Sequence, residues 1–350
     1  MKSFHIAIVG ATGLVGEKIR EVLEERNFPI NSLRLFSSER SKDVTLLFRG
    51  EKIPVETLPP LDRNSTFDIR HSKFFVGVDI IFFSAGKKVS NAWAPIIAKN
   101  GSLVIDNSSA FRLDPEVPLV VPEVNPEALS NYQKGIIANP NCSTIQMVVA
   151  LHPLHKVARM KRIVVSTYQS VSGYGREAVE VLQKETHTIL HRSKFSSDSY
   201  PFPHSIAFNI IPQIDDFNEK GESLEEWKMV EETRKILAEP DLRITATCVR
   251  VPVFTGHSEA VNVEFEKKIT AEEAREILSH SPGVSVIDNP ENSKYPLPMD
   301  AVGKDDVFVG RIREDLSVES GLNLWIVSDN LRKGAATNAI QIAEHLFSAD

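Results

Sequence analysis

Cys142 lies in the stretch NPNCSTIQM, residues 139–147, in a setting that is typical of a nucleophile. The preceding Asn-Pro-Asn predicts an irregular turn, and the following Ser-Thr pair opens an apolar run that predicts a helix. A thiol at a helix N-terminus feels the positive end of the helix dipole, which lowers its pKa and makes thiolate available at neutral pH. A free cysteine is more commonly a small buried apolar residue, and Cys248, inside the strand-like run ITATCVRVPV, fits that description.

The stretch RVPVFTGHSEAV, residues 250–261, offers the partners that a cysteine nucleophile needs. Arg250 ends a predicted strand and His257 follows a glycine-containing turn, so both side chains can point into one cleft. Arginine suits bidentate recognition of a carboxylate, and a histidine near its unperturbed pKa can move a proton on and off the reacting oxygen or sulfur. Either residue alone is more often a surface or structural group, so the pair gains its meaning from Cys142.

Two further spacings have ordinary interpretations. Glu225 and Lys228 stand three residues apart on one face of a predicted helix, which favours an exposed ion pair. His187 and His191 stand four apart, but the glutamate of an HExxH motif is missing and no cysteine or aspartate cluster lies nearby. We therefore expect no bound metal.

A glycine-rich turn, GATGLVG, follows the first predicted strand and opens the first predicted helix. Gly10, Gly13 and Gly16 let the backbone approach a pyrophosphate, and the helix N-terminus presents free N–H groups to it. The spacing GxxGxxG departs from the GxGxxG fingerprint. Its position in a strand–helix–strand rhythm nevertheless favours a dinucleotide site over a tight turn without a ligand.

The end of the second predicted strand helps to choose the cofactor. NAD-binding proteins usually place Asp or Glu there for the ribose hydroxyls, whereas this chain runs SSERSK, residues 37–42. Hydroxyl groups and an arginine suit the 2′-phosphate of NADP, although Glu39 would favour NAD if its side chain faced the ribose. We predict NADP, with NAD or a solvated charged loop as the alternatives.

The composition is that of an ordinary globular protein, with 42% hydrophobic and 25% charged residues in a length of 350 that allows two domains. The net charge of −7 comes without a basic patch or an arginine-rich tract, which argues against nucleic acid as a partner. No apolar run reaches the ~18 residues of a membrane span. Two distant cysteines and no secretory cleavage pattern predict a reducing, cytoplasmic location.

The elements that must position these residues follow an α/β pattern. Strands are predicted at 4–10, 32–38, 78–86 and 102–108, with helices at 15–27 and 89–101. This alternation predicts a Rossmann-type, doubly wound dinucleotide domain over residues 1–141. Strand-like runs then dominate (161–171, 244–253, 260–266, 305–315 and 322–330), with helices near 176–191, 223–237 and 270–280. They predict a mixed α+β domain over residues 142–329, and a C-terminal helix within 330–350 is expected to complete the first domain.

Beyond these single motifs, the chain resembles the bacterial aspartate-semialdehyde dehydrogenases over nearly its whole length. The resemblance is carried by GATGLVG, RSKD, NSSAFRLDPEVPLVVPEVN, NPNCSTIQM, TYQSVSGYGREAV, FPHSIAFNIIPQID, EEWKMVEETRKIL, RVPVFTGHSEAVNVEF and SDNLRKGAA, of which NCSTIQ together with GHSE is specific. It implies a phosphorylating aldehyde dehydrogenase that works through a cysteine thioester. Such an enzyme interconverts L-aspartate 4-semialdehyde, phosphate and NADP⁺ with 4-phospho-L-aspartate and NADPH, in lysine, threonine and methionine biosynthesis.

The resemblance also implies roles for individual residues. Cys142 would be the nucleophile, His257 the acid/base, and Gln169 the residue that orients the thioester intermediate. Arg250 would bind the substrate α-carboxylate and Glu225 its ammonium group. This implied role of Glu225 replaces the ion-pair interpretation that spacing alone favours.

Phosphate and cofactor contacts are implied in the same way. Arg112 and Lys228 would bind phosphate. The cofactor would be held by Gly10, Thr12, Gly13, Leu14, Val15, Ser38, Arg40, Ser41, Ser172, Gly173 and Asn330. Tyr174 departs from the pattern, because the family usually has a small residue there, and it could narrow the nicotinamide pocket.

Three alternatives share part of this pattern, and one of them, glyceraldehyde-phosphate dehydrogenase, shares only the logic of the chemistry. N-acetylglutamyl-phosphate reductase shares the architecture and chemistry, but a different sequence around its cysteine and no EEWK partner for a free amine would be expected. A non-catalytic dinucleotide-binding relative would be expected to have lost the cysteine or the histidine, and both are present here. The resemblance further implies a homodimer or homotetramer that assembles through the second domain.

Overall fold

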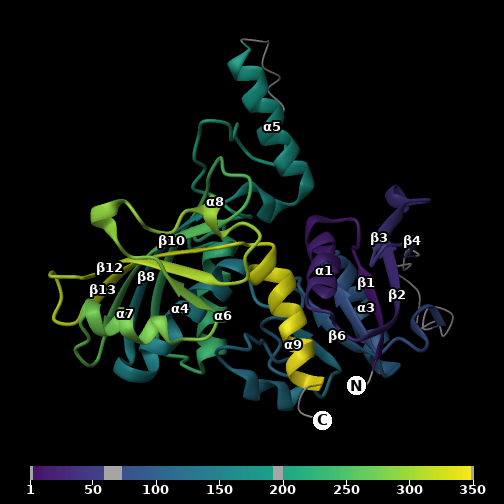
Figure 1. The fold of residues 1–350 in the computed structure, drawn as a ribbon, viewed down its shortest axis with the longest axis horizontal. Helices are drawn as coiled ribbons and strands as arrows, with labels where there is room; N and C mark the ends of the chain where they lie inside the picture. The colour runs from purple at the N-terminus through teal and green to yellow at the C-terminus, as the bar shows by residue number, and fades with distance from the viewer. Residues whose placement is uncertain (1–2, 59–72, 192–199, 348–350) are drawn as a thin grey trace. The chain divides into compact units, whose positions relative to one another are not determined.

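The computed structural model describes residues 3–58, 73–191 and 200–347 (Figure 1). The chain divides into two compact units. Unit 1 comprises Met1–Pro140 with Ala335–Asp350, and unit 2 comprises Asn141–Gly334. Within the described ranges, no helix has both the length and the apolar character that crossing a membrane requires.

In the described part of unit 1, seven strands form a sheet in the order β3-β4-β2-β1-β5-β6-β7. The strands are β1 (Phe4–Val9), β2 (Ile30–Ser37), β3 (Thr45–Phe48), β4 (Glu51–Thr57), β5 (Ile80–Phe83), β6 (Leu103–Asp106) and β7 (Ile136–Ala138). Neighbouring strands are parallel except in the β3–β4 hairpin. The connections leave β1 in both directions, towards β2 and towards β5, which creates the crevice where sheets of this kind bind nucleotides.

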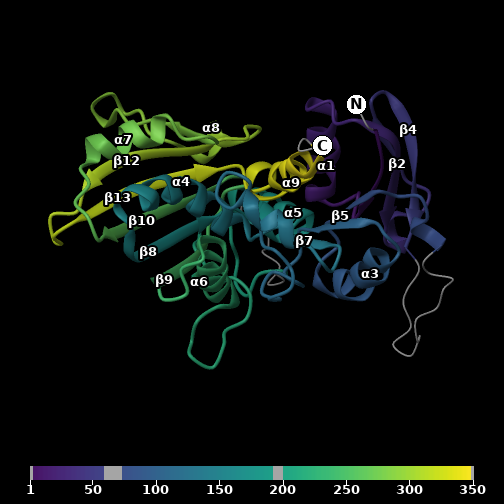
Figure 2. The same ribbon diagram turned by 90° about the horizontal axis from the view of Figure 1, so that it is seen from below.

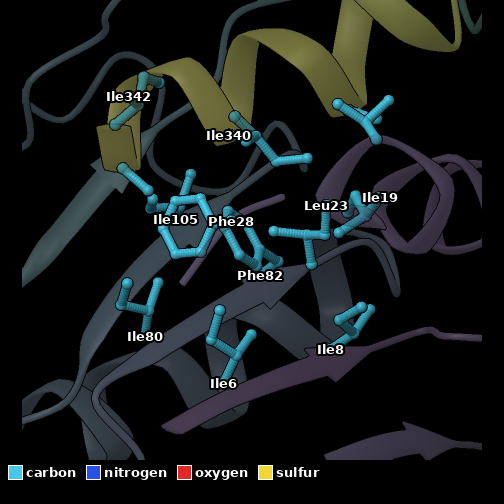
Figure 3. Packing of buried hydrophobic residues seen from close by; sticks show 14 of the residues in the cluster. Ile6, Ile8, Ile19, Leu23, Phe28, Ile80, Phe82, Ile105, Ile340 and Ile342 are labelled. Atoms are coloured by element: carbon cyan, nitrogen blue, oxygen red, sulfur yellow. The ribbon is translucent and has the colours of Figure 1, made fainter. Parts of the chain in front are cut away.

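The core of unit 1 lies between this sheet and two helices, α1 (Leu14–Glu25) and α9 (Thr337–Phe347). Figure 3 shows side chains of α9 and α1 directed toward the sheet, with Ile340 and Leu23 above Phe82. Helix α3 (Lys87–Lys99) lies on the other face, where its Trp93 contacts Phe75. Helices on both faces explain why the central strands are almost wholly apolar.

Two elements of unit 1 were not predicted from the sequence. The β3–β4 hairpin turns at Arg49-Gly50, and both residues have positive φ, 51° and 79°. That is the geometry of a two-residue hairpin turn, which the Arg-Gly pair between two short strands only weakly signals. Strand β7 is three residues long, too short for a recognisable apolar pattern.

In the described part of unit 2, six strands form a sheet in the order β11-β12-β13-β10-β8-β9. The strands are β8 (Met160–Gln169), β9 (Arg243–Arg250), β10 (His257–Phe265), β11 (Val284–Val286), β12 (Val307–Glu314) and β13 (Gly321–Ser328). The pairs β8–β9 and β11–β12 are parallel and the others antiparallel. The predicted fold class, a Rossmann-type unit and a mixed second domain, is confirmed.

Helices α4 (Cys142–Ala158), α6 (Leu224–Leu237) and α7 (Ala271–Ser279) pack on one face of this sheet, the inner face (Figures 1 and 2). Helix α4 is buried from Ser143 through Leu151, so it lies at the centre of the unit. The opposite, outer face carries Tyr168 and Trp325, whose rings lie 5.5 Å apart. Two further helices, α5 (Arg176–Leu190) and the short α8 (Pro298–Ala301), complete the unit.

The boundaries of the units differ slightly from the predicted 1–141, 142–329 and 330–350. The chain enters unit 2 at Asn141 and returns to unit 1 at Ala335. Helix α9 begins only at Thr337, because Arg332–Ala336 form a π-helical turn. The last residues of the predicted helical segment, 348–350, lie outside the described residues.

Candidate active site

Three strand ends of unit 2 bring expected site residues together on the inner face. Gln169 ends β8 and Arg250 ends β9, and these two residues are partners in the parallel register. His257 begins β10, which runs antiparallel to β8. All three side chains are buried, at 1%, 3% and 0% exposure respectively. The register therefore builds a polar corner from positions 169, 250 and 257.

Cys142 is the first residue of α4, where the sequence predicts a helix start. The side chain of Asn141 caps the helix, because its Oδ1 accepts hydrogen bonds from the N–H groups of Ser143 and Thr144 at 2.9 and 3.3 Å. The backbone N–H of Asn141 donates in turn to Glu232 Oε2 at 2.6 Å. The thiol thus stands at the positive end of a helix dipole, on a turn that is fixed from two sides.

Gly334 packs directly against the cysteine. A Cβ at position 334 would lie 2.8 Å from Cys142 Cβ, closer than real Cβ atoms approach. Sequence reasoning missed this residue, although it lies in the SDNLRKGAA stretch. Glycine at 334 therefore protects the position of the thiol.

Cys248 has the opposite character. It is fully buried, and its Sγ lies 3.7 Å from Met229 Sδ. Burial raises the pKa of the Cys248 thiol far above its ordinary value. This cysteine is a packing residue, as its strand-like sequence predicts.

His257 is held through one ring nitrogen. Its Nδ1 accepts a hydrogen bond from the backbone N–H of Ser170 at 3.1 Å and lies 3.0 Å from Ser170 Oγ. Since an N–H group points at Nδ1, the neutral ring carries its proton on Nε2, which has no hydrogen-bond partner among the described residues. Burial, helped by the charge of Arg250, lowers the pKa of His257 to about 3. The expectation of a histidine near its unperturbed pKa is therefore wrong for this environment.

The guanidinium of Arg250 lies close to His257, beneath the turn at Gly173. Arg250 Nη1 donates to the carbonyl oxygen of Ser170 at 2.7 Å. A Cβ at position 173 would lie 3.0 Å from Arg250 Nη1 and 3.2 Å from His257 Nε2. Burial lowers the pKa of Arg250, and the nearby Glu225 and Cys142 favour its charged form. Glycine at 173 leaves room over both groups.

Glu225, near the start of α6, is held by three side-chain partners. Its Oε1 accepts from Asn141 Nδ2 at 2.8 Å and from Gln169 Nε2 at 3.1 Å, and its Oε2 from Lys228 Nζ at 3.0 Å. Burial would raise the pKa of Glu225, but the charge of Lys228 and these hydrogen bonds outweigh it and lower the pKa to about 2. Glu225 is therefore a carboxylate at neutral pH, and it links the cap of α4 to Gln169.

Lys228 bonds to two carboxylates, those of Glu225 and Asp215. Burial would lower the pKa of Lys228, but these two neighbours raise it above its ordinary value. The structure therefore contains the ion pair that the spacing of Glu225 and Lys228 indicates. The pair differs from the exposed one expected from spacing, because the Glu225 side chain is only 6% exposed. A role of Lys228 in phosphate binding stays a prediction.

Asn330 organises the loops around His257. Its Oδ1 accepts hydrogen bonds from Ser170 Oγ at 3.1 Å, from Ser172 Oγ at 3.3 Å and from the N–H of Gly256 at 2.9 Å. Gly256 directly precedes His257, and Ser170 holds its ring. Asn330 thus joins the two loops that orient the imidazole, a connection that sequence reasoning missed.

The glycines of GATGLVG shape a tight turn in unit 1. Gly10 has a φ of +90°, and a Cβ there would lie 2.6 Å from the carbonyl oxygen of Ser84. A Cβ at Gly16 would lie 2.3 Å from the carbonyl oxygen of Gly10, so helix α1 can approach the turn only with glycine there. Gly13 is the N-cap of α1. The turn leaves a helix N-terminus without a side chain over it.

A cavity of about 450 Å³ opens at this turn, within unit 1. Its lining includes four of the predicted cofactor residues, Gly10, Thr12, Gly13 and Ser38, and adds Ser37, Ser84, Lys88 and Trp93. Leu14, Val15, Arg40 and Ser41 are not among the residues that line it.

Thr12 Oγ1 lies 2.7 Å from Ser37 Oγ and 3.0 Å from Ser41 Oγ. This hydroxyl cluster connects the glycine turn to the end of β2. It could be found only by combining two distant stretches of sequence.

Arg112 belongs to unit 1 and is 8% exposed. Its Nε donates to the carbonyl oxygen of Asn139 at 3.0 Å and its Nη2 to that of Asn107 at 2.9 Å. Backbone carbonyl groups thus orient the guanidinium. Phosphate binding by Arg112 stays a prediction.

The remaining candidates have local explanations. The rings of His187 and His191 stack at 4.1 Å, and His191 Nδ1 lies 2.8 Å from the carbonyl oxygen of His187. In the part of the chain that the structure describes, no three His, Cys, Asp or Glu side chains are grouped to hold a metal ion. The ring of Tyr174 lies 5.9 Å from that of Phe202, and together with Arg250 both line a cavity of about 290 Å³.

Comparison with known proteins agrees with this architecture. Family models match at residues 5–132, "Semialdehyde dehydrogenase, NAD binding domain", and at residues 151–333, "Semialdehyde dehydrogenase, dimerisation domain". An aspartate-semialdehyde dehydrogenase of Aquifex aeolicus is 55% identical over 344 residues, 98% of each chain.

Two solved structures are similar to this chain along its whole length. Aspartate semialdehyde dehydrogenase II of Vibrio cholerae, complexed with ASA, has a TM-score of 0.92 and 47% identity over 99% of each chain. The Candida albicans enzyme with NADP has a TM-score of 0.72 and 25% identity over 99% of this chain and 98% of that one. With relatives of this identity along its whole length and family models on both units, the chain belongs to the aspartate-semialdehyde dehydrogenase family.

Proposed function

We propose that the protein interconverts L-aspartate 4-semialdehyde, phosphate and NADP⁺ with 4-phospho-L-aspartate and NADPH, in the cytoplasm, for lysine, threonine and methionine biosynthesis. The observation that carries this proposal is the buried corner of unit 2, where Gln169, Arg250 and His257 meet. The charge of Arg250 interacts there with the sulfur of Cys142. The Vibrio cholerae relative in complex with ASA supports the same substrate.

The residues of unit 1 fit a dinucleotide. The glycine turn leaves space that a Cβ would fill, at the start of α1 and beside a cavity of about 450 Å³. We assign NADP because hydroxyl groups of Thr12, Ser37 and Ser41 gather there, with Arg40 next to them in sequence. The Candida albicans relative with NADP supports this choice.

In the proposed mechanism, Cys142 thiolate attacks the carbonyl carbon of the acyl phosphate, whose C–O bond to phosphate breaks as phosphate leaves. In the other direction it adds to the aldehyde carbon, and the C=O π bond opens to an oxyanion. His257 Nε2–H donates a hydrogen bond to the oxyanion that develops, because Nδ1 is occupied by Ser170. The nicotinamide cofactor supplies or accepts the hydride when bound. Gln169, fixed by Glu225, orients the thioester.

Recognition of the substrate follows from charge. Arg250 would pair with the α-carboxylate, and Glu225, a carboxylate at neutral pH, would favour the ammonium group. Lys228 and Arg112 would bind phosphate. For Lys228 this role competes with its present bonds to Glu225 and Asp215, so binding would have to loosen that ion pair.

The test is NADP⁺ reduction by aspartate semialdehyde with and without phosphate, run beside NAD⁺ and beside N-acetylglutamate semialdehyde. We expect turnover that needs phosphate and prefers NADP⁺, and Arg40→Ala should reduce that preference. Turnover of the N-acetylated substrate alone would indicate a reductase for N-acetylglutamyl phosphate instead. NADP⁺ binding without turnover would indicate a non-catalytic relative.

We also propose a homodimer that assembles through the outer face of the unit 2 sheet, since this unit matches a dimerisation domain. Tyr168 is 38% exposed there, and its ring lies beside that of Trp325, so the two rings offer an aromatic surface to a partner. Tyr168→Glu is expected to shift the mass in light scattering from dimer or tetramer to monomer, because it buries a charge in the interface. Leu316→Glu, at a position 93% exposed beyond β12, is the control and should leave the mass unchanged. A wild-type monomer would contradict the proposal.

A further inference from the structure

Glu259 is a buried acid that the proposed reaction does not use. It follows His257 by two residues on β10, so both side chains lie on the inner face. Glu259 is 0% exposed, and neither of its carboxyl oxygens makes a hydrogen bond of ordinary geometry with the described residues. Burying an ionised carboxylate without partners is strongly unfavourable, so the group needs a proton, a partner or both.

The polar group that faces Glu259 is the side-chain amide of Gln146. Gln146 lies one helical turn after Cys142 on α4, on the same helix face. Its Oε1 accepts a hydrogen bond from Ser328 Oγ at 2.7 Å, whereas its buried Nε2 also lacks a partner among the described residues. Three polar atoms without partners, one on Gln146 and two on Glu259, therefore meet at one place.

One proton on Glu259 would allow all three atoms to form hydrogen bonds. A carboxylic acid and a primary amide each offer one donor and one acceptor, so they can form a pair of parallel hydrogen bonds. The amide N–H then meets the acid carbonyl oxygen, and the acid O–H meets the amide oxygen. An ionised Glu259 can accept from the amide, but it leaves its second oxygen buried with a charge.

The surroundings favour the neutral acid. The neighbours of Glu259 on the sheet are Thr167 on β8, Cys248 on β9, Ile326 and Ser328 on β13, and His257 on its own strand. Gln146 faces it from α4, and Glu225 and Glu226 of α6 lie beyond Cys248. Cys248 and His257 are both neutral at pH 7, because burial raises the pKa of one and lowers that of the other. Burial likewise raises the pKa of Glu259 well above its ordinary value.

We propose that Glu259 is a positioning residue, which pairs as a neutral acid with Gln146 and so holds the Cys142 end of α4 against the His257 end of β10. The proposal rests on the assignment of Cys142 and His257 as the reacting pair. Helix α4 packs on β10 and β13, and the pair of Glu259 and Gln146 bridges that contact. The distance between the Cys142 sulfur and the His257 ring then depends on the contact between two uncharged side chains, Glu259 and Gln146.

The first test uses Glu259→Gln, which keeps the shape and the paired hydrogen bonds but cannot ionise. At pH 7, the infrared difference spectrum between wild type and variant should show the C=O stretch of a protonated carboxylic acid. The free energy of unfolding of the variant should increase relative to that of wild type as pH rises from about 5 to 9. In the unfolded chain Glu259 releases its proton near pH 4.3, roughly, while the folded protein keeps it, so wild-type stability falls with pH.

Glu264→Gln is the matched control. It makes the same chemical change on the same strand, on the outer face, where Glu264 pairs with Arg162 at 2.9 Å. Its difference in stability from wild type should stay constant between about pH 6 and 9, because Glu264 has an arginine partner and faces away from Gln146. Carboxylate bands for Glu259, or a constant gap for Glu259→Gln, would overturn the neutral acid whether or not the enzyme has the proposed activity.

The positioning role has its own readout in the folded wild-type and variant enzymes. Glu259→Ala should lower kcat about 10-fold or more with little change in KM, whereas Glu259→Gln should keep kcat within about threefold of wild type. If both variants lose kcat equally although the acid band is present, Glu259 does not act through the pair. If Glu259→Ala fails to fold, full activity of Glu259→Gln supports the pair and its loss overturns it.

Discussion

Replacing Cys142 with alanine is expected to abolish the phosphate-dependent reduction of NADP⁺ by aspartate semialdehyde. The expected loss in kcat is at least about 10⁴-fold, because the thioester cannot form without the sulfur. Cys142→Ser should be nearly as inactive, since a hydroxyl group at a helix N-terminus remains protonated at neutral pH. Initial rates measured at saturating substrate, with folding checked by thermal melting, decide the result.

The chain supplies a matched control in its other cysteine. Cys248→Ala removes a buried thiol beside Met229 and should retain activity, at the cost of about 1 kcal/mol or more of stability. Iodoacetamide should label Cys142 in the native protein and leave Cys248 unlabelled, because Cys248 is 0% exposed and burial raises its pKa. Equal loss of activity in both alanine variants would argue against Cys142 as the nucleophile.

Much of the fold could be read from the sequence, because the central strands of unit 1 are buried on both faces and therefore mostly apolar. β1 and β5 are examples, as FHIAIV and IIFF. The start of α4 was predictable for a different reason, namely the Asn-Pro-Asn turn followed by a Ser-Thr pair that opens an apolar run. These signals are local, so a single sequence carries them.

The site was less predictable, because its geometry depends on contacts between distant residues. The pKa of His257 depends on its burial and on Arg250, and its tautomer depends on the N–H of Ser170, 87 residues earlier. The close contact between Gly334 and Cys142 joins the end of unit 2 to its beginning. The spacing of residues along the sequence does not predict contacts between residues so far apart.

The ion pair of Glu225 and Lys228 shows what residue spacing can predict and what it cannot. Spacing correctly predicted the contact at 3.0 Å but placed it on the surface. Burial turned it into part of a network with Asn141 and Gln169, which helical periodicity alone does not reveal. Local pattern thus identified the partners, while the tertiary fold decided what the pair does.

His257→Asn is expected to lower kcat by about 10²- to 10⁴-fold, the usual worth of a positioned proton donor. Asparagine can place its Oδ1 near the present Nδ1 and keep a partner for the Ser170 N–H, so the loop should hold while the Nε2–H is lost. The defect should lie mainly in kcat, with KM nearly unchanged. His280→Asn, at a position whose side chain is 76% exposed, is the control and should have wild-type rates.

The pH dependence gives this prediction its sharpest form. Since the pKa of His257 is lowered to about 3, the imidazole of the free enzyme is neutral across the physiological range. The plot of kcat/KM against pH should therefore contain no ionisation near pH 6.5, roughly the ordinary histidine value, that is lost in His257→Asn. In the unfolded chain this histidine takes up a proton near pH 6.5, roughly, while the folded protein excludes it down to about pH 3. The unfolded state therefore binds more protons between these values, and wild type should lose stability relative to His257→Asn as the pH falls through that window. A limb near pH 6.5 together with a constant stability gap would mean that the imidazole is protonated in the free enzyme, and Nε2 would then act as an acid from the start.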